Sequence, residues 1–366
     1  MRIRLLKLID KIFGWLFPYA FLRMPGTPFR ILSSILIIRP GGIGDAVLLL
    51  PTIQALKNTF PNAAIYILAE KRNSAVFFMS PFIKRTFCYD KPFELFNALK
   101  DDYDVVIDTE QWHHLSAVVA KLTKAPVLIG FATNSRERAF THPVPYSHAD
   151  YELKSFMNLL LPLAVPVNSD STPFLAISDN SAARARKLLG SLEDKSFVTI
   201  FPGASISEKC WNVEKFKQLA SSINSIGIPI VILGDKECMD DGQKIISDSY
   251  SNLNLGGGTS LLEASAILAK SLLLVSGDSG LLHMAMGFGT ATVSLFGPSN
   301  TKKWAPKGNE HISISKNLAC SPCSKFGYTP TCQINAKCMS DITVDEVFDA
   351  VLRLLEKTGN LPQKGK

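Results

Sequence analysis

Residues 35–45 read Ile-Leu-Ile-Ile-Arg-Pro-Gly-Gly-Ile-Gly-Asp, and residues 272–280 read Leu-Leu-Leu-Val-Ser-Gly-Asp-Ser-Gly. Each stretch is an apolar run followed by a glycine turn that carries an aspartate, and a helix-like pattern comes next. A buried parallel strand that opens through glycines onto a helix N-terminus presents free N–H groups and a positive dipole to an anion. Two such turns, about 230 residues apart, predict two Rossmann-like halves that face each other across a cleft. One half would hold a nucleotide-linked donor and the other an acceptor.

The composition is that of a globular protein with much buried α/β structure. The chain has 366 residues, of which 46% are hydrophobic and 19% charged, so it is long enough for two domains with separate cores. The chain contains no uncharged run of eighteen apolar residues, and we therefore predict no membrane-spanning helix. The net charge of +7 comes from 39 basic and 32 acidic residues. The basic residues do not form the long stripe that is typical of a nucleic-acid-binding protein. Their excess therefore indicates attraction to phosphorylated substrates or to an anionic membrane surface.

The seven cysteines are an odd number, and three of them are scattered through core-like segments. This pattern argues against a secreted disulfide framework and favours the cytosol. The other four, Cys320, Cys323, Cys332 and Cys338, lie in a loop with the spacing Cys-x2-Cys-x8-Cys-x5-Cys. They are candidates for a structural zinc site, with two redox-labile pairs or free thiols as the alternatives. We assign them no catalytic role.

The N-terminal segment is predicted to form a basic amphipathic helix over residues 2–17. Arg4, Lys7, Asp10 and Lys11 fall on one side, and an apolar face that includes Leu8 falls on the other. Such a helix is suited to the plane of a membrane surface, and packing on the protein's own surface is the alternative. A signal peptide is disfavoured, since charges interrupt the apolar stretch and no small-residue cleavage site follows.

Strand and helix patterns alternate through the rest of the chain, which predicts parallel, doubly wound sheets. The first series has strands at 35–39, 64–69, 104–108 and 127–130, with helices at 46–58 and 115–122. After a polar, proline-rich linker, the second has strands at 197–201, 229–233, 272–275 and 292–296, with helices at 181–189, 213–222, 261–269 and 281–286. The predicted domains are an N-terminal helix and linker (1–29), a first Rossmann-like domain (30–165), a second (166–343) with a Cys-rich loop (318–340), and a C-terminal helix and tail (344–366). That last helix is a candidate to pack back onto the first half.

Five motifs, in this order, resemble glycosyltransferase family 9, the ADP-heptose:lipopolysaccharide heptosyltransferases. They are residues 37–45 with 50–56, residues 103–108, Pro-Gly-Ala-Ser at 202–205 with Lys-Cys-Trp at 209–211, Asp-Ser-Gly-Leu-Leu-His at 278–283, and Leu-Phe-Gly-Pro-Ser at 295–299. They span most of the chain from residue 31 to about 345. The resemblance implies the GT-B fold of two Rossmann-like domains, a nucleotide-diphosphate sugar donor, inversion at the anomeric carbon and no catalytic metal.

The resemblance makes Asp45 the general base of that reaction. An inverting transfer needs one carboxylate to take the proton of the attacking acceptor hydroxyl. The nucleotide diphosphate leaves readily, so no second carboxylate has to protonate it. From its position alone Asp45 would rather be a helix N-cap, a role that can coexist with catalysis. Gly41, Gly42 and Gly44 are the expected turn or phosphate-binding glycines.

Donor-binding residues are expected in the second half. Lys209 follows a small-residue turn and matches a phosphate ligand of the family, where its charge would offset the charge that builds up on the diphosphate. Ser205 and Ser207 are candidate donors of hydrogen bonds to the phosphates. The backbone N–H groups of Ser279 and Gly280 are expected to point at the donor phosphates, with Asp278 holding a sugar hydroxyl or the turn. His283 is expected to face the diphosphate or Asp278. The structural alternatives are an ordinary surface lysine and an ordinary core histidine.

Acceptor-binding residues are expected in the first half. Asp108 and Glu110 follow the carboxyl end of a strand, where ligands bind in such sheets. Arg136 and Arg138 lie in a polar loop and are candidates to meet acidic sugars or phosphates, with a solvated loop as the alternative.

The sequence therefore predicts an enzyme that moves a heptose from ADP-heptose to the inner core of lipopolysaccharide or a related lipid-linked glycan. It would need no cofactor and would act in the cytoplasm, on the inner face of the cytoplasmic membrane. A UDP- or GDP-sugar donor is the main alternative. A Rossmann dehydrogenase is disfavoured, since the first turn lacks the G-x-G-x-x-G order and only Glu70 could serve as the acidic strand-end residue. A binding module with a degenerate site is the remaining alternative.

Overall fold

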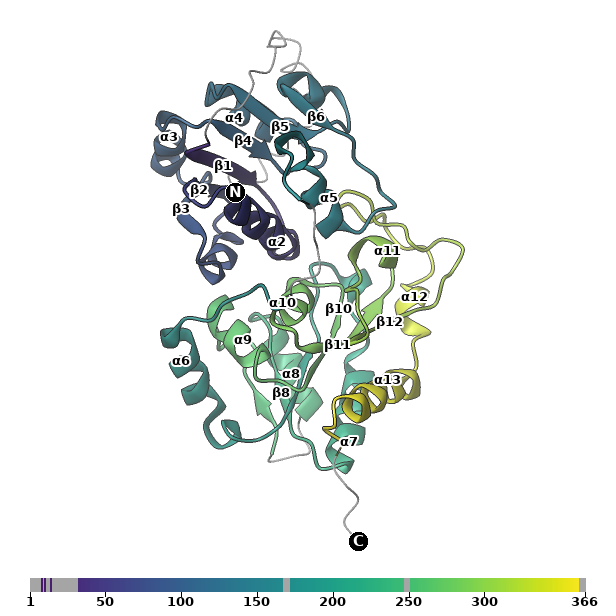
Figure 1. Cartoon of the computed structure of the whole chain (residues 1–366). Helices are drawn as coiled ribbons and strands as arrows, with labels where there is room; N and C mark the ends of the chain where they lie inside the picture. Colours follow the sequence, from purple (N-terminus) through teal and green to yellow (C-terminus); the bar gives the residue numbers. More distant parts are fainter. Residues whose placement is uncertain are drawn as a thin grey trace. The chain divides into compact units, whose positions relative to one another are not determined.

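A computed structural model describes residues 32–166, 172–246 and 251–361, together with Leu8, Asp10 and Gly14. The chain divides into two compact units, Met1–Ser171 and Thr172–Lys366. Each unit contains one parallel six-stranded sheet with helices on both faces (Figure 1). Most of the predicted N-terminal helix and part of the predicted interdomain linker lie outside the described residues.

The first sheet has the strand order β3-β2-β1-β4-β5-β6. Its strands are β1 (Ser34–Arg39), β2 (Ala64–Ala69), β3 (Ile83–Cys88), β4 (Val105–Asp108), β5 (Val127–Phe131) and β6 (His142–Val144). Its helices are α2 (Ile43–Thr59), α3 (Pro92–Lys100), α4 (Leu115–Leu122) and α5 (Glu152–Asn158), with 3-10 turns η2 (Ser74–Met79), η3 (Ser135–Ala139) and η4 (Leu161–Leu163).

The central strands of this sheet are apolar throughout because both of their faces are covered. Leu36 and Ile38 of β1 pack in one cluster with Ala98 of α3 and Ala117 of α4. The alternating residues of β1 point to the opposite face of the sheet, where α2 and α5 pack together (Figure 1).

The second sheet has the order β12-β11-β10-β7-β8-β9, the same winding as the first. Its strands are β7 (Val198–Phe201), β8 (Ile230–Ile232), β9 (Leu253–Asn254), β10 (Leu273–Gly277), β11 (Ala291–Phe296) and β12 (His311–Ser315). Its helices are α6 (Asp179–Leu189), α7 (Val213–Ser225), α8 (Cys238–Ile246), α9 (Leu261–Leu268), α10 (Gly280–Phe288), α11 (Thr301–Trp304), α12 (Lys337–Ser340) and α13 (Val344–Lys357), with 3-10 turns η5 (Gly190–Leu192) and η6 (Ser207–Lys209).

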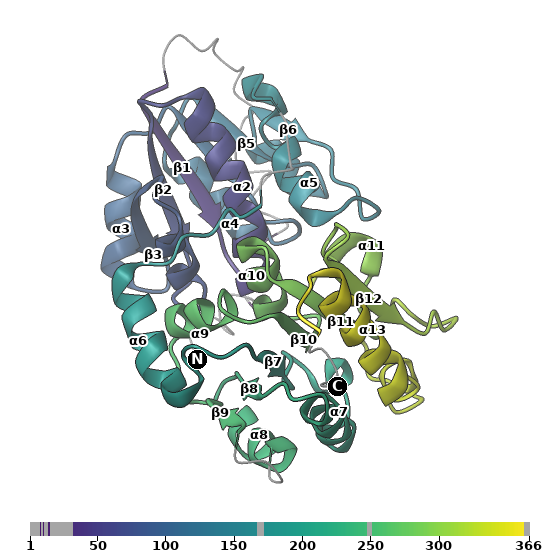
Figure 2. The same cartoon turned by 60° about the horizontal axis from the view of Figure 1, so that its bottom comes forward.

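Helix α13 belongs to the core of the second unit. Its apolar face, which includes Val347 and Val351, is fully buried in a cluster with Phe216 of α7 and Ile200 of β7. Figure 2 shows α13 beside α7, while α9 and α10 cover the other face of the sheet. The apolar face of this helix is therefore used within the second unit, and its packing onto the first half gains no support.

The winding of both sheets places one functional position in each unit. In a doubly wound sheet, ligands bind at the carboxyl ends of two neighbouring parallel strands, at the point where the order of the strands reverses. Those neighbours are β1 and β4 in the first unit and β7 and β10 in the second. The predicted site residues should therefore gather after Arg39 and Asp108, and after Phe201 and Gly277.

Candidate active site

Asp45 lies in the first turn of α2, directly after β1. Gly42 is the N-cap of this helix and Asp45 is the third residue beyond it, so Asp45 is not the N-cap. A carboxylate in the first turn still suits the positive end of the helix. A Cβ at Gly42 would lie 2.8 Å from Asp45 Oδ2, so a larger residue there would displace this carboxylate from its position. Asp45 is half-buried, which leaves part of its surface open to a substrate.

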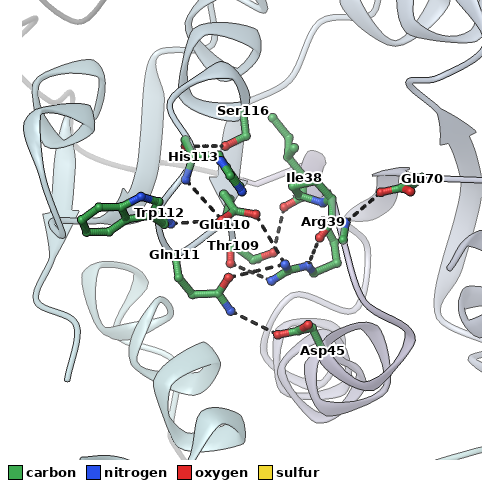
Figure 3. Close-up of polar contacts among 12 residues, drawn as sticks. Ile38, Arg39, Asp45, Glu70, Thr109, Glu110, Gln111, Trp112, His113 and Ser116 are labelled. Atoms are coloured by element: carbon green, nitrogen blue, oxygen red, sulfur yellow. Dashed lines mark hydrogen bonds and ion pairs between the residues drawn. The ribbon is translucent and has the colours of Figure 1, made fainter. Parts of the chain in front are cut away.

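The loop after β4 brings a side-chain amide to Asp45 (Figure 3). Gln111 Nε2 lies 3.2 Å from Asp45 Oδ1. Arg39, at the end of β1, is buried and donates from Nη1 to Thr109 O at 2.9 Å. Its other terminal nitrogen lies 3.5 Å from Gln111 Oε1 and 3.6 Å from Glu110 Oε2. Neither Arg39 nor Gln111 is among the site residues predicted from the sequence, although both lie at the switch point between β1 and β4.

Glu110 is occupied by its own loop. Its Oε1 accepts from the backbone N–H groups of Trp112 (3.0 Å) and His113 (3.3 Å). Burial on its own would raise the pKa of Glu110, but the charges of Arg39, His113 and Arg136 outweigh it and hold the pKa below its ordinary value. An ionised, buried Glu110 therefore shapes the loop, and its predicted acceptor contact gains no support.

Asp108 and Arg136 form a fully buried ion pair, with Arg136 Nη2 2.5 Å from Asp108 Oδ2. The same guanidinium donates to the backbone carbonyls of Glu110, His113 and Phe131. Since neither side chain has exposed surface, neither can touch a sugar in this conformation. This corrects the acceptor contact predicted for them. Arg138, two residues further on, is exposed, and its acceptor role stays a prediction.

Gly41 and Glu70 connect β1 to β2 at the same edge of the sheet. Gly41 has a φ of +101°, which favours glycine, and its N–H donates to Glu70 Oε2 at 3.2 Å. Tyr89 Oη donates to the same oxygen at 2.9 Å, and Arg72 Nε pairs with Oε1 at 2.9 Å. Gly44 lies inside α2. Because both carboxylate oxygens of Glu70 already have partners within the protein, the ribose contact that a dehydrogenase would need has no support.

Asp10 reaches this region from the N-terminal segment. It is buried, and its Oδ1 accepts from the N–H groups of His114 (2.8 Å) and Leu115 (2.6 Å) at the start of α4. Asp10 thus satisfies N-terminal donors of α4. Leu8 is 51% exposed. The sequence placed Asp10 on the polar face of the helix, and it is this side chain that lies against the protein.

The second switch point gathers a lysine, an aspartate and a serine. Lys209 Nζ lies 2.7 Å from Asp278 Oδ2, and Ser299 Oγ donates to the same oxygen at 2.6 Å. His283 is buried, with Nε2 3.9 Å from Asp278 Oδ1. Of the two positions expected for His283, the structure therefore shows the one facing Asp278. Gly277 permits this assembly, because a side chain there would begin 3.0 Å from Lys209 O.

Asp278 is ionised in this setting. Burial alone would raise the pKa of Asp278, but the charges of Lys209 and His283 and the hydrogen bonds from Lys209 and Ser299 hold it below the ordinary value. A folded-state pKa below the unfolded one adds stability above the unfolded pKa, and this stability is lost as the pH falls through the folded pKa.

The remaining predicted donor residues lie around this cluster. Ser279 is the N-cap of α10, since its hydroxyl accepts from Leu282 N at 3.2 Å, and Gly280 is the first residue of the helix. Ser205 and Ser207 are exposed in the turn before Lys209. Their contacts with a donor stay predictions.

The four loop cysteines give no support to a structural zinc. All seven cysteines are free, Cys320 is exposed and Cys338 is buried. Burial and the neighbouring thiols raise the pKa values of Cys323 and Cys338. Across the described residues, which include these four, no three His, Cys, Asp or Glu side chains are grouped to bind a metal.

In the same residues, no helix is both long enough and apolar enough to cross a bilayer.

Comparisons with known proteins identify the family and the fold. Lipopolysaccharide heptosyltransferase 3 of Escherichia coli is 25% identical over 293 residues, which cover 74% of this chain and 85% of that protein. The structure of a family 9 glycosyl transferase from Veillonella parvula DSM 2008 matches with a TM-score of 0.75 at 20% identity, over 89% of this chain and 98% of that one. The ADP-heptose LPS heptosyltransferase II of E. coli matches with a TM-score of 0.72 at 19% identity, over 89% and 100%. The fold is thus of the predicted GT-B type. The sequence model of glycosyltransferase family 9 (heptosyltransferase) matches residues 93–331, more than half of the chain, which therefore belongs to that family.

Proposed function

We propose that this glycosyltransferase moves a heptose from ADP-heptose to the inner core of lipopolysaccharide or a related lipid-linked glycan, with inversion and with Asp45 as the general base. The observation that supports this most is the half-buried Asp45 carboxylate, held by Gln111 at the β1/β4 switch point. The names of the similar proteins, lipopolysaccharide heptosyltransferase 3 and ADP-heptose LPS heptosyltransferase II, support the donor and acceptor classes.

In the proposed step, the acceptor hydroxyl oxygen forms a bond to the anomeric carbon of the heptose. Asp45 takes the proton of that hydroxyl, which makes the oxygen a better nucleophile as it attacks. The bond between the anomeric carbon and the phosphate oxygen breaks, and its electron pair leaves with ADP. Lys209 and the N-terminus of α10 would stabilise the charge that develops on the diphosphate. These side chains supply the base and the phosphate charge partner that the step needs.

The test of this function is transfer with defined substrates. The purified chain is incubated with ADP-heptose and a heptose-deficient lipopolysaccharide, and both ADP release and acceptor mass are followed. We expect one heptose to be added per acceptor, and we expect ADP release to fall to background without acceptor. Transfer from a UDP- or GDP-sugar but not from ADP-heptose would overturn the donor assignment. A failure to transfer any of these sugars would overturn the proposed function.

Lys209→Met should impair donor use in particular. We expect kcat to fall about 10²- to 10³-fold, the scale for loss of one group that stabilises developing charge. The KM for ADP-heptose should rise as well, because lysine attracts the diphosphate in the ground state. Steady-state kinetics with Lys195→Met, an exposed lysine of the same unit, provide the control. An unchanged donor KM together with an unchanged kcat would remove Lys209 from the donor site.

We also propose that the enzyme is cytoplasmic and works at the inner face of the cytoplasmic membrane, where a lipid-linked acceptor is anchored. Leu8 is 51% exposed, whereas Asp10 is buried against α4. This contrast supports contact of the N-terminal segment with the membrane. Residues two apart lie on nearly opposite sides of a helix, so the apolar side would face outward. Sedimentation of the full chain with anionic lipid vesicles tests this. Retained binding by a Leu8→Glu variant would count against the apolar contact.

A further inference from the structure

We infer that Gln111 is a positioning residue for Asp45, and that Glu152 and Tyr146 in turn hold Gln111. This inference rests on the proposed function, because it takes Asp45 as the base. The four residues come from four separate segments of the first unit, namely α2, the loop after β4, the segment after β6, and α5.

The contacts of Gln111 determine which way its amide points. Nε2 donates to Glu152 Oε1 at 2.6 Å and to Asp45 Oδ1 at 3.2 Å. Oε1 lies 3.5 Å from Arg39 Nη2, a group that can only donate. A flipped amide would place its oxygen against two carboxylates and its nitrogen against a guanidinium. The orientation is therefore set by charge on both sides, and the amide nitrogen faces the two carboxylates. Figure 3 shows the contacts of Gln111 with Asp45 and Arg39.

Glu152 holds the far side of this amide. Its side chain is fully buried, and it also accepts from Tyr146 Oη at 3.1 Å. Burial and the neighbouring Glu152 carboxylate raise the pKa of Tyr146, so its hydroxyl keeps its proton and remains a donor. Arg39 is buried as well, and it donates from Nε to Pro40 O at 2.6 Å and from Nη1 to Thr109 O at 2.9 Å. Gln111 is thus held from two sides by buried groups, and only its contact to Asp45 reaches a half-buried residue.

This arrangement gives the amide a defined role. A hydrogen bond to Asp45 Oδ1 fixes the rotation of the carboxylate, so that the same oxygen is presented to each acceptor hydroxyl. The amide also separates Asp45 from Glu152, two carboxylates that would otherwise repel each other. The charged and titratable groups around it are Arg39 from β1, Asp45 from α2, Glu110 from the loop after β4, Tyr146 from the segment after β6, and Glu152 from α5.

Two substitutions at this position test the role. Gln111→Met keeps the length of the side chain and removes the amide, and we expect kcat to fall about 10- to 100-fold, the scale for loss of a hydrogen bond to a charged group. The KM for ADP-heptose should not change. Gln111→Glu adds a negative charge beside Asp45, which favours the protonated form of that carboxylate. We therefore expect the acid limb of the pH–rate profile to move to higher pH, a shift that general loss of stability would not cause.

The double variant separates positioning from a structural role. If Gln111 acts through Asp45, then Asp45→Asn with Gln111→Met should be no slower than Asp45→Asn alone, whereas independent effects would multiply. Gln218→Met, an exposed glutamine on α7, is the matched control, and thermal unfolding checks that each variant is folded. Wild-type kcat and an unmoved pH profile in both Gln111 variants would overturn the inference. If Asp45→Asn lost activity in the same experiment, Asp45 would still stand as the base. Full activity in Asp45→Asn would overturn the base itself, and the inference with it.

Discussion

Asp45→Asn should lower kcat about 10²- to 10⁴-fold, the usual contribution of one positioned general base. Asparagine is close to isosteric, and its side-chain oxygen can still accept the hydrogen bond from Gln111 Nε2 that Asp45 Oδ1 accepts at 3.2 Å. The variant therefore changes the ability to take a proton and little else. The KM for ADP-heptose should stay near the wild-type value, because the proposed donor residues belong to the other unit. Initial rates of ADP release at saturating acceptor give both constants.

The control for Asp45→Asn is the same substitution at Asp102, an exposed carboxylate of the same unit. Asp102→Asn should transfer heptose at the wild-type rate. If Asp45→Asn keeps more than about a tenth of the wild-type kcat, a loss far below the range for a general base, then Asp45 does not take the proton. The carboxylate would then be a first-turn residue that suits the positive end of α2.

The positions of the two switch-point sites could be predicted because each depends on residues that are adjacent in the sequence. A buried strand that leads through glycine into a helix produces a pattern in consecutive residues. The predicted bounds of the strands that end near Arg39 and Gly277 therefore nearly match the observed ones. The two turns also contain Asp45 and Asp278, so the local sequence alone predicts that each aspartate follows the end of a strand. The resemblance then supplied their roles.

Edge elements were harder to predict because their patterns are weak. Strand β3 (Ile83–Cys88) has the exposed Lys84 and Arg85 in its middle and buried residues only at its end, and β12 has no fully buried residue. Neither forms the continuous apolar run that identifies a central parallel strand. The short α8 and α12 were missed for a related reason, since a single buried face a few residues long is not distinctive.

The supports of the site were missed because they join distant segments. Gln111 and Glu152 lie 41 residues apart in sequence but bond at 2.6 Å. Arg136 resembled a surface arginine, yet its side chain is fully buried against Asp108. Charge in a polar-looking loop predicts exposure in most proteins, and only the fold shows that β4, β5 and η3 enclose this pair. Asp10 is a similar case, because its contact at the start of α4 spans more than a hundred residues.

Arg136→Met should destabilise the first unit by about 3–5 kcal/mol, the cost of leaving one charge of a buried pair without its partner. Asp108 would remain fully buried, and the carbonyls of Glu110, His113 and Phe131 would each lose a donor. For a unit of this size such a loss lowers the midpoint of thermal unfolding by on the order of 10 °C. Calorimetry of the full chain, in which the transition of the first unit moves and that of the second does not, is the measurement.

Two further variants show whether the ion pair causes that loss. Arg138→Met changes the same residue type two positions away on η3, where the side chain is exposed, so its effect should stay within about 0.5 kcal/mol. Adding Asp108→Asn to Arg136→Met removes the stranded charge, and we expect this double variant to be more stable than Arg136→Met alone. If the double variant is instead less stable, then the packing of the arginine stem supplies the stability and the charge pair does not. Since Arg136 also holds the carbonyl of Glu110, directly before Gln111, the single variant should lose transfer activity even at temperatures where it stays folded.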